Sequence, residues 1–280
     1  MKIGIIGPAE RSVAWEKHLR PHQLVSEVRI AATLDDIGAV DACFLLDETP
    51  ARLNNLLNTI KLGIPTFLVS TLPSDSQLIE KIYHASQEAN VQIQFSHWPT
   101  LAPATQWMVK QISTPNFIQV RREMSYTSFL ESNISLEDLW IDEVAYCAKY
   151  IGGAVHHSDI NISKLKSGKA YSMHVMLRFN SGATAGIYIS VSATENNHSR
   201  FIANNTLQLK CNVGQQTVRL GKENASGHLY FEKKLFDPSL AAEQSAIQFL
   251  KAIQLNNATL YNSYDLHQLS RLVDQIKGQS

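Results

Sequence analysis

The chain has 280 residues, of which 44% are hydrophobic, and its 25 Lys and Arg residues balance 25 Asp and Glu residues, so the formal net charge is zero. This length suits two domains, and the charge balance argues against nucleic acid or a membrane surface as a partner. Three well-separated cysteines, Cys43, Cys147 and Cys211, match no metal-ligand spacing, and no run of about 18 apolar residues occurs, so we expect a soluble cytoplasmic protein without a metal site.

The first twelve residues, MKIGIIGPAERS, begin like a nucleotide-binding strand and turn. The apolar residues from Lys2 to Ile6 predict a short buried strand, and Gly7 opens the turn after it. In the fingerprint G-x-G-x-x-G, the second glycine lets a pyrophosphate approach the backbone and the third lets helix and strand pack closely. Ala9 and Ser12 occupy those two positions here. The pattern therefore still indicates a nucleotide-binding type of fold, but it gives weaker support for a bound dinucleotide.

Two interpretations of this turn stay open. Gly7, Pro8, Ala9 and Ser12 can still seat a pyrophosphate at a helix N-terminus, because backbone amides and the helix dipole supply much of such a site. Alternatively, Ser12 only caps the helix, which we predict from Val13 to Leu19.

The next predicted strand runs from Val28 to Ala31, and the residue before it is a candidate for the acidic residue that binds an adenosine ribose. Such a residue is expected about 20 residues beyond the glycine turn, where Glu27 stands; an ordinary surface charge is the alternative. Residues 28–40 leave little room for the usual crossover helix before the following strand. We therefore expect one helix, and at most one strand, to be missing from this half.

The remaining elements to residue 115 alternate between strand and helix, which predicts a parallel sheet with crossover helices, a shortened Rossmann-like nucleotide-binding domain over residues 1–115. The strands are Ala42 to Leu46, Thr66 to Val69 and Val91 to Phe95, and the helices run through Leu53 to Lys61 and Asp75 to Ala89.

Residues 116–280 are predicted to form an α+β domain with an open antiparallel sheet. Strand-like alternation runs from Phe117 to Tyr126 and over most of Ala170 to Leu235, with a hairpin at Asn180, Ser181 and Gly182. Helices are expected over Leu136 to Ile151, Leu240 to Ile253 and Ser263 to Ile276. The last two helices are candidates for packing back on the first domain.

Several short segments have a characteristic order and spacing: the N-terminal turn, DETP at 47–50, GIPT at 63–66, the hairpin LRFNSGATAGI, and the ending EQSAIQFLKAIQLNN with NSYDLHQLSRLVDQI. Together they resemble the glucose-fructose oxidoreductase, inositol dehydrogenase and MocA family over nearly the whole chain. The resemblance implies a Rossmann domain followed by an open-sheet domain, with hydride transfer between a nicotinamide cofactor, NAD or NADP, and a sugar-like alcohol or carbonyl. It also implies that Thr49 and Pro50 lie beside the cofactor, and that two chains pair through the C-terminal sheet as a homodimer.

This chain departs from the family where the chemistry is expected. Leu72, before Pro73, stands where the family has a lysine that orients and helps protonate the substrate oxygen, and leucine cannot transfer a proton. In the family's D-x-x-x-H helix, Asp138 falls at the aspartate and Asp142 at the histidine, by counting back from Gly152. A carboxylate there can relay protons if burial keeps it protonated near neutral pH.

Three residues are candidates to replace the lost lysine as proton donor. His97 follows a strand and has an ordinary pKa near neutrality, although a structural hydrogen bond is the alternative role. Asp142 and Tyr146 lie one turn apart on one helical face, where packing against the sheet is the alternative for Tyr146.

The sequence thus supports an NAD(P)-dependent oxidoreductase with a degenerate active site as the leading hypothesis. A biliverdin-reductase-like enzyme is a variant of it, since such proteins also lack the lysine. The competing hypothesis is a non-catalytic binding or assembly module that keeps the fold, because Ala9, Leu72, Asp142 and the short nucleotide-binding half are four separate losses.

Overall fold

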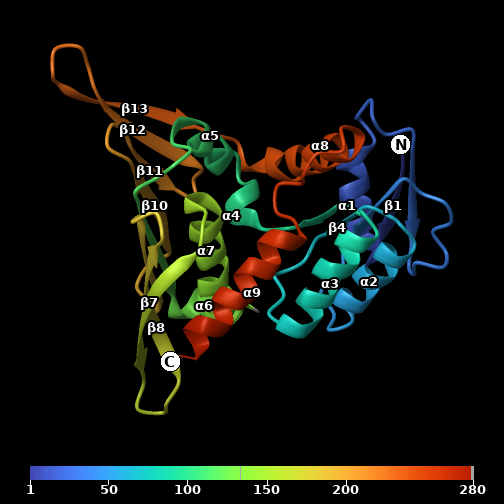
Figure 1. Ribbon diagram of the computed structural model, residues 1–280, viewed down its shortest axis with the longest axis horizontal. Helices are drawn as coiled ribbons and strands as arrows, with labels where there is room; N and C mark the ends of the chain where they lie inside the picture. The colour runs from blue at the N-terminus through green and yellow to red at the C-terminus, as the bar shows by residue number, and fades with distance from the viewer. Residues whose placement is uncertain (133, 279–280) are drawn as a thin grey trace. The chain divides into compact units, whose positions relative to one another are not determined.

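The computed structural model describes residues 1–132 and 134–278, which divide into two compact units (Figure 1). The first unit contains Met1–Leu101 and Ser239–Arg271, and the second contains Ala102–Pro238 and the residues from Leu272 onward. The division falls at Leu101 rather than at residue 115, and a late segment of the chain belongs to the first unit.

The first unit is built on five parallel strands in the order β2-β1-β3-β4-β5. The strands are β1 (Lys2–Ile6), β2 (Glu27–Ala31), β3 (Ala42–Leu45), β4 (Thr66–Leu68) and β5 (Ile93–Phe95). The crossover helices are α1 (Ala9–Leu19), α2 (Arg52–Lys61) and α3 (Ser76–Glu88), and the short α4 (Trp98–Leu101) follows β5. The strand order reverses at β1, so α1 covers one face of the sheet and α2 with α3 the other.

The connection from β2 to β3, residues 32–41, contains no helix, as the sequence predicts. The usual doubly wound order 3-2-1-4-5-6 has a further strand beyond the second one, and no strand of this unit's described residues occupies that place. Within the described residues, this half of the sheet thus has one helix and one strand fewer than the usual doubly wound fold.

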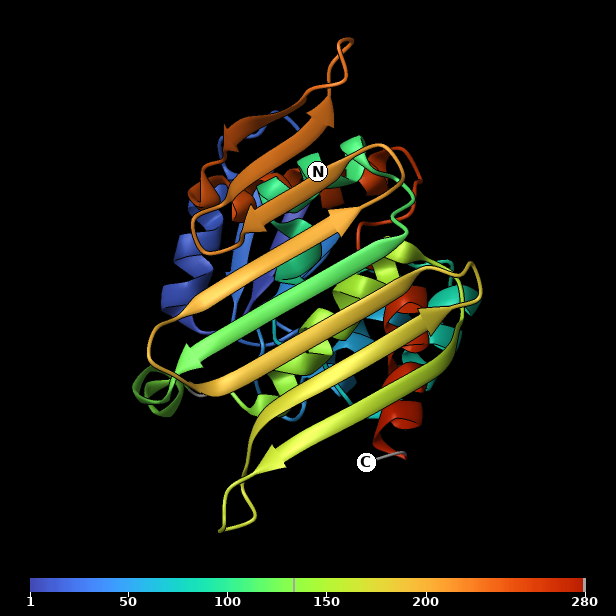
Figure 2. The ribbon, with the colours of Figure 1, turned by 90° about the vertical axis from the view of Figure 1, so that its left-hand side faces the viewer.

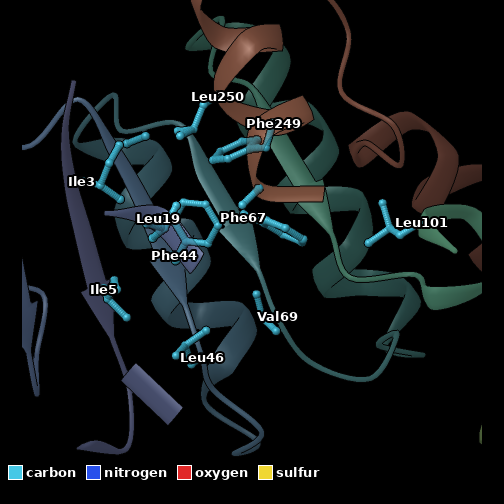
Figure 3. Packing of buried hydrophobic residues seen from close by; sticks show 12 residues of the cluster. Ile3, Ile5, Leu19, Phe44, Leu46, Phe67, Val69, Leu101, Phe249 and Leu250 are labelled. Atoms are coloured by element: carbon cyan, nitrogen blue, oxygen red, sulfur yellow. The ribbon is translucent and has the colours of Figure 1, made fainter. Parts of the chain in front are cut away.

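The core of the first unit joins the sheet to α8 (Ala241–Gln254), so a helix from the end of the chain completes the hydrophobic cluster (Figure 3). Phe249 of α8 meets Phe44 and Phe67, with ring centroids 5.6 Å apart in both pairs. Phe44 and Phe67 also contact Trp15 of α1. All three phenylalanines are fully buried, so α8 is an integral layer of this unit.

The second unit is an eight-stranded sheet in the order β13-β12-β11-β10-β6-β9-β8-β7, antiparallel except where β6 pairs with β9. Its strands are β6 (Phe117–Ser125), β7 (Val155–Lys164), β8 (Ala170–Phe179), β9 (Thr184–Ala193), β10 (Asn197–Ala203), β11 (Gln208–Asn212), β12 (Thr217–Glu223) and β13 (Leu229–Leu235). Its helices are α5 (Pro103–Gln111), α6 (Tyr126–Glu131) and α7 (Leu136–Ile151), and α9 (Ser263–Lys277) enters this unit with its last residues.

Helix α7 packs on β6, β8 and β9, and so covers one face of this sheet. Figure 2 shows the opposite face, on which the eight strands lie in front of the unit's helices. The predicted α/β domain followed by an open antiparallel sheet is therefore confirmed, and the elements that periodicity did not predict include α4, α5, α6 and β7.

Candidate functional site

Three parallel strands of the first unit, β1, β3 and β4, end at the same edge of the sheet. Gly7 follows β1 and lies directly against the end of β3: a Cβ atom at residue 7 would come within 2.7 Å of both the Cβ and the carbonyl oxygen of Leu46. Any side chain here would force the two strand ends apart. The glycine is therefore required by close packing of the turn, which places the start of α1 over the carboxyl edge.

The N-terminus of α1 carries no side-chain cap among the described residues. Pro8 is the N-cap residue, and no side-chain cap hydrogen bond to it is found in the described part of the chain. Ala9, the first helical residue, is exposed. The first backbone N–H groups of a helix lack intrahelical acceptors and carry the positive end of the helix dipole, so an uncapped first turn can bind a phosphate group.

Ser12 lies inside α1 and does not cap it, because the helix begins at Ala9 and not at Val13. Its side chain is fully buried, and its hydroxyl donates to the carbonyl oxygen of Gly7 at 3.3 Å. A small residue is needed at this contact between helix and turn. Ser12 thus takes the packing role of the third glycine in the G-x-G-x-x-G fingerprint, and its hydroxyl has a hydrogen-bond partner.

Arg11 is a residue of this edge that the sequence analysis missed. Its Nη1 atom lies 3.2 Å from Glu48 Oε1, just after β3, and Nη2 donates to the carbonyl oxygen of Val69 at 3.4 Å, just after β4. A basic residue in the first turn of a helix runs against the helix dipole, which favours acids there, and this was the available signal. Arg11 therefore brings a cation to this edge of the sheet.

Thr49 and Pro50 are exposed and follow Glu48, so the structure brings them to the same edge as Gly7, Ala9 and Ser12. The backbone N–H of Thr49 donates to Asp47 Oδ1 at 2.7 Å, and Asn55 donates to Asp47 Oδ2 at 2.8 Å. Asp47 therefore holds the loop between β3 and α2 in a fixed turn.

Glu27 lies at the wrong end of its strand to bind a ribose at this edge. It is the first residue of β2 and pairs with Lys2, whereas Ile6, next to Gly7, pairs with Ala31. Four residues of strand, about 13 Å, separate the two ends. Glu27 forms an ion pair with Arg29 at 2.7 Å. The carboxylates that follow the correct end of β2 are Asp35 and Asp36, and Asp36 accepts a hydrogen bond from Thr33.

Two further positions of the first unit are buried. His97 has no exposed surface, and its Nδ1 atom lies 2.7 Å from Thr100 Oγ1, while its ring packs on Tyr261. This contact fixes the first turn of α4. Leu72, at the place of the family lysine, is 6% exposed. The loop after β4 therefore presents a hydrocarbon side chain where the resemblance implies a proton donor.

In the second unit, Glu143 of α7 is a fully buried carboxylate surrounded by cations. Arg200 of β10 donates to both of its oxygens at 3.0 Å, His198 Nε2 lies 2.9 Å from Oε1, and Arg122 of β6 lies 3.4 Å from the same oxygen. Burial by itself would raise the pKa of Glu143, but the attraction of Arg200 and His198 outweighs it and holds that pKa well below the usual range. Glu143 is therefore ionised and ties α7 to β6 and β10.

Asp142, the preceding residue, shares Arg122 with Glu143: its Oδ2 atom lies 3.6 Å from Nη1. Its side chain keeps 31% of its surface exposed. Burial of the carboxyl group raises its pKa to about 7, with Arg122 opposing the shift and the charge of Glu143 adding to it. Asp142 can thus give or take a proton near neutral pH.

The neighbouring candidates on α7 have structural roles. Asp138 forms a capping box with Ser135, since each residue's side chain bonds the other's backbone N–H. Tyr146 is 1% exposed, and the guanidinium of Arg200 lies 4.2 Å from its ring centroid. Burial raises the pKa of Tyr146, so the phenol stays protonated. Tyr146 supports the buried arginine, and the structure does not bring its hydroxyl to the surface with Asp142.

Solved structures with the same fold were found for the whole chain. UDP-N-acetylglucosamine 3-dehydrogenase GnnA from Acidithiobacillus ferrooxidans matches with a TM-score of 0.84 at 15% identity, covering 100% of this chain and 97% of that one. An NAD binding oxidoreductase from Klebsiella pneumoniae matches with a TM-score of 0.84 at 11% identity, covering 100% and 96%. The chain has the glucose-fructose oxidoreductase, inositol dehydrogenase and MocA fold.

Levoglucosan dehydrogenase, in a complex with NADH, shares this dehydrogenase fold with a TM-score of 0.79 at 12% identity, covering 100% of this chain and 96% of that one. No family model and no curated protein matches the sequence. At these identities the likeness establishes the fold, and the chemistry has to be argued from this chain's own residues.

The uncapped start of α1 and the small residues at positions 9 and 12 fit the pyrophosphate of a nicotinamide dinucleotide. No helix in the described residues is long and apolar enough to cross a membrane. Over residues 1–132 and 134–278, no group of three or more His, Cys, Asp or Glu side chains is placed to hold a metal ion.

Proposed function

We propose that this protein is an NAD(P)-dependent oxidoreductase of the type that its fold represents, with a diverged active site. The observation that carries the proposal is the uncapped N-terminus of α1 at the carboxyl edge of the parallel sheet. Gly7, Pro8, Ala9 and Ser12 would hold the pyrophosphate through backbone groups, with Thr49 and Pro50 beside them. When bound, the nicotinamide ring supplies hydride transfer.

Asp142 is the proposed proton donor and acceptor. Of the three candidates, it alone combines a partly exposed carboxyl group with a pKa near neutrality, because His97 and Tyr146 are buried. Arg122 would hold the carboxylate in place and stabilise its ionised form after the proton has left. The substrate class is the one implied by the resemblance, a sugar-like alcohol or the related carbonyl compound.

Titration with NADH and with NADPH tests this proposal. Trp15 of α1 belongs to the first unit, so energy transfer from tryptophan to the nicotinamide reports binding. We expect micromolar binding and a preference for one of the two cofactors. Ala9→Asp should weaken binding at least tenfold, about 1.4 kcal/mol, because it sets a carboxylate against the pyrophosphate.

The matched control is Ala14→Asp, which adds the same charge at another exposed position of α1. An acid at the first position of a helix is favourable, so Ala9→Asp should fold normally. Absence of binding at millimolar NADH and NADPH would sink the proposal, and so would equal affinities for Ala9→Asp and the wild-type protein.

A non-catalytic module is the second candidate, and the burial of Leu72 favours it, since no side chain at that place can act on a substrate oxygen. The biliverdin-reductase-like variant shares the same observation. Absorbance changes of a bilin mixed with the protein and NADPH test that variant. If cofactor binds and neither bilins nor a panel of sugars and alcohols turn over, the module is supported.

We also propose that two chains pair through the outer face of β8 and β9. That face carries Met176 and Tyr188, each 37% exposed, among the polar residues His174 and Arg178. Gly186 allows Met176 to lie flat, since a Cβ there would come within 3.3 Å of its sulfur. Light scattering of the purified protein tests the pairing; a mass of one chain at all concentrations would exclude it.

A further inference from the structure

The outer face of β10 to β13 carries three cations in register. Lys210 of β11 lies opposite Arg219 of β12, and Arg219 lies opposite Lys233 of β13. All three side chains are exposed. We name Lys210, Arg219 and Lys233 the cation ladder. Directly opposite like charges on neighbouring strands, about 4.8 Å apart, repel one another, so the arrangement favours an anion that lies across all three.

No ion pair found within residues 1–132 and 134–278 includes a member of the cation ladder. Glu232, the carboxylate that lines one of the two hollows beside the ladder, pairs with Lys222 at 3.1 Å. On the same face, Glu123 pairs with Arg121. The positive charge of the ladder is therefore available to a ligand.

Two hollows meet at the cation ladder. One has a volume of about 260 Å³ and is polar, with Asn197, Ser199 and Asn212 beside the three cations. The other has a volume of about 390 Å³ and adds Phe201 and Phe231 as aromatic walls. The larger volume is in the range of small-molecule sites, and the two hollows together offer hydrogen-bonding groups on one side of the charges and aromatic rings on the other.

Gly221 shapes the aromatic side. It pairs with Phe231 across β12 and β13, and a Cβ at residue 221 would come within 3.0 Å of the Phe231 ring. The ring therefore lies close over β12, while Phe231 remains 63% exposed. An exposed ring fixed beside a cluster of cations can stack on a planar ligand.

We propose that the outer face of β10 to β13 binds an organic phosphate with a planar ring, its phosphate on Lys210, Arg219 and Lys233 and its ring against Phe231. This site is separate from the turn at Gly7, and its occupancy does not depend on the proposed oxidoreductase activity. Three probes separate the contributions: inorganic phosphate carries the charge, 1-naphthol carries the ring, and 1-naphthyl phosphate carries both.

Calorimetric titration of the full chain with the three probes tests the proposal. We expect 1-naphthyl phosphate to bind at least tenfold more tightly than inorganic phosphate or 1-naphthol. Arg219→Gln should weaken 1-naphthyl phosphate about tenfold, because it removes the central charge of the ladder. Phe231→Ala should weaken 1-naphthyl phosphate and leave inorganic phosphate unchanged.

Lys166→Gln is the matched control, since Lys166 is an exposed cation of the same unit, in the loop between β7 and β8. Lys166→Gln should leave the affinity for 1-naphthyl phosphate unchanged, and so should Ala9→Asp. An equal effect of Lys166→Gln and Arg219→Gln would overturn the proposal in favour of general charge attraction. Binding of 1-naphthyl phosphate no tighter than that of inorganic phosphate would also overturn it.

Discussion

Two adjacent acids of α7 have opposite protonation behaviour because their surroundings differ. Glu143 is enclosed by Arg200, His198 and Arg122 and stays ionised, whereas the carboxylate of Asp142 lies 3.6 Å from the shared Arg122. Burial then raises the pKa of Asp142 to about 7. Surroundings that give two neighbouring carboxyl groups very different pKa values are typical of sites that transfer protons.

The raised pKa of Asp142 predicts a specific pH dependence of stability. In the unfolded chain this group loses its proton near pH 4, and in the folded protein near pH 7, so the folded state binds more protons between these values. The stability that the protonated group contributes is present below pH 4 and is lost as the pH rises to 7. Asp142→Asn removes this loss.

Chemical denaturation at pH 4.5 and at pH 8 therefore provides the measurement. Relative to wild type, we expect Asp142→Asn to gain about 1–2 kcal/mol of unfolding free energy between the two pH values, allowing for the exposure of the side chain. Asp35→Asn, at an exposed loop position, should show no such gain. Parallel pH profiles for Asp142→Asn and wild type would contradict the assignment.

The buried Glu143–Arg200 ion pair leads to a prediction about the unfolding free energies of single and double variants. Glu143→Gln leaves the guanidinium of Arg200, which is 1% exposed, without its counter-charge, and should cost about 3–5 kcal/mol of unfolding free energy. The double variant Glu143→Gln with Arg200→Met removes both charges and should be more stable than Glu143→Gln alone. Thermal and denaturant unfolding of the three proteins measure this; a double variant less stable than the single one would be the contrary result.

At the scale of elements, α1 is the helix on which the proposed cofactor binding depends, and Arg11 in its first turn pairs with Glu48. An exposed pair of this kind contributes at most about 1 kcal/mol, so it can open in favour of a stronger anion. Glu48→Gln should therefore release Arg11 and tighten NADH or NADPH binding severalfold, whereas Arg11→Gln should weaken it.

The same tryptophan energy-transfer titration measures both Glu48→Gln and Arg11→Gln. Glu10→Gln is the control, because it removes a negative charge from the same turn without releasing Arg11. If Glu48→Gln and Glu10→Gln tighten binding equally, the effect is one of net charge and not of the Arg11–Glu48 contact.

The sequence predicted most elements of both units because their apolar periodicity is strong. Leu136–Ile151 was predicted to the residue, and the strand Lys2–Ile6 likewise. Helices α4 and α5 were not predicted, because Pro99 and Pro103 in a short segment without clear periodicity indicate a loop. In the structure both prolines occupy early helical positions, where proline is tolerated. The start of α1 was placed too late because Ser12 resembles a cap, although Pro8 is the N-cap residue.

The candidate site was harder to predict than the fold. Spacing placed Glu27 near a ribose, but distance along the sequence does not say at which end of a strand a residue lies. The cluster around Glu143 joins α7, β6 and β10, and its partners Arg122 and Arg200 are separated from it by 21 and 57 residues. Nothing in the local pattern of α7 indicates these contacts. Long-range pairing therefore had to come from the structure.

At the scale of the whole molecule, the chain returns to the first unit after completing the second, and α8 fills the core there. Phe249 is fully buried and lies 5.6 Å from the rings of Phe44 and Phe67, which belong to neighbouring strands of the parallel sheet. The first 101 residues therefore lack part of their own hydrophobic core, and the first unit depends on a segment that begins at Ser239.

Phe249→Ala should accordingly destabilise the first unit by about 3–5 kcal/mol, since it removes a buried aromatic ring and leaves a cavity between the sheet and α8. Thermal unfolding followed by the fluorescence of Trp15, which packs on Phe44, measures the loss. Leu255→Ala, a truncation just beyond α8 of a side chain that is 65% exposed, should change the unfolding temperature little. If both variants unfold at the wild-type temperature, α8 is not part of this core. A loss confined to Phe249→Ala would show that the first unit needs α8, from the end of the chain, for its stability.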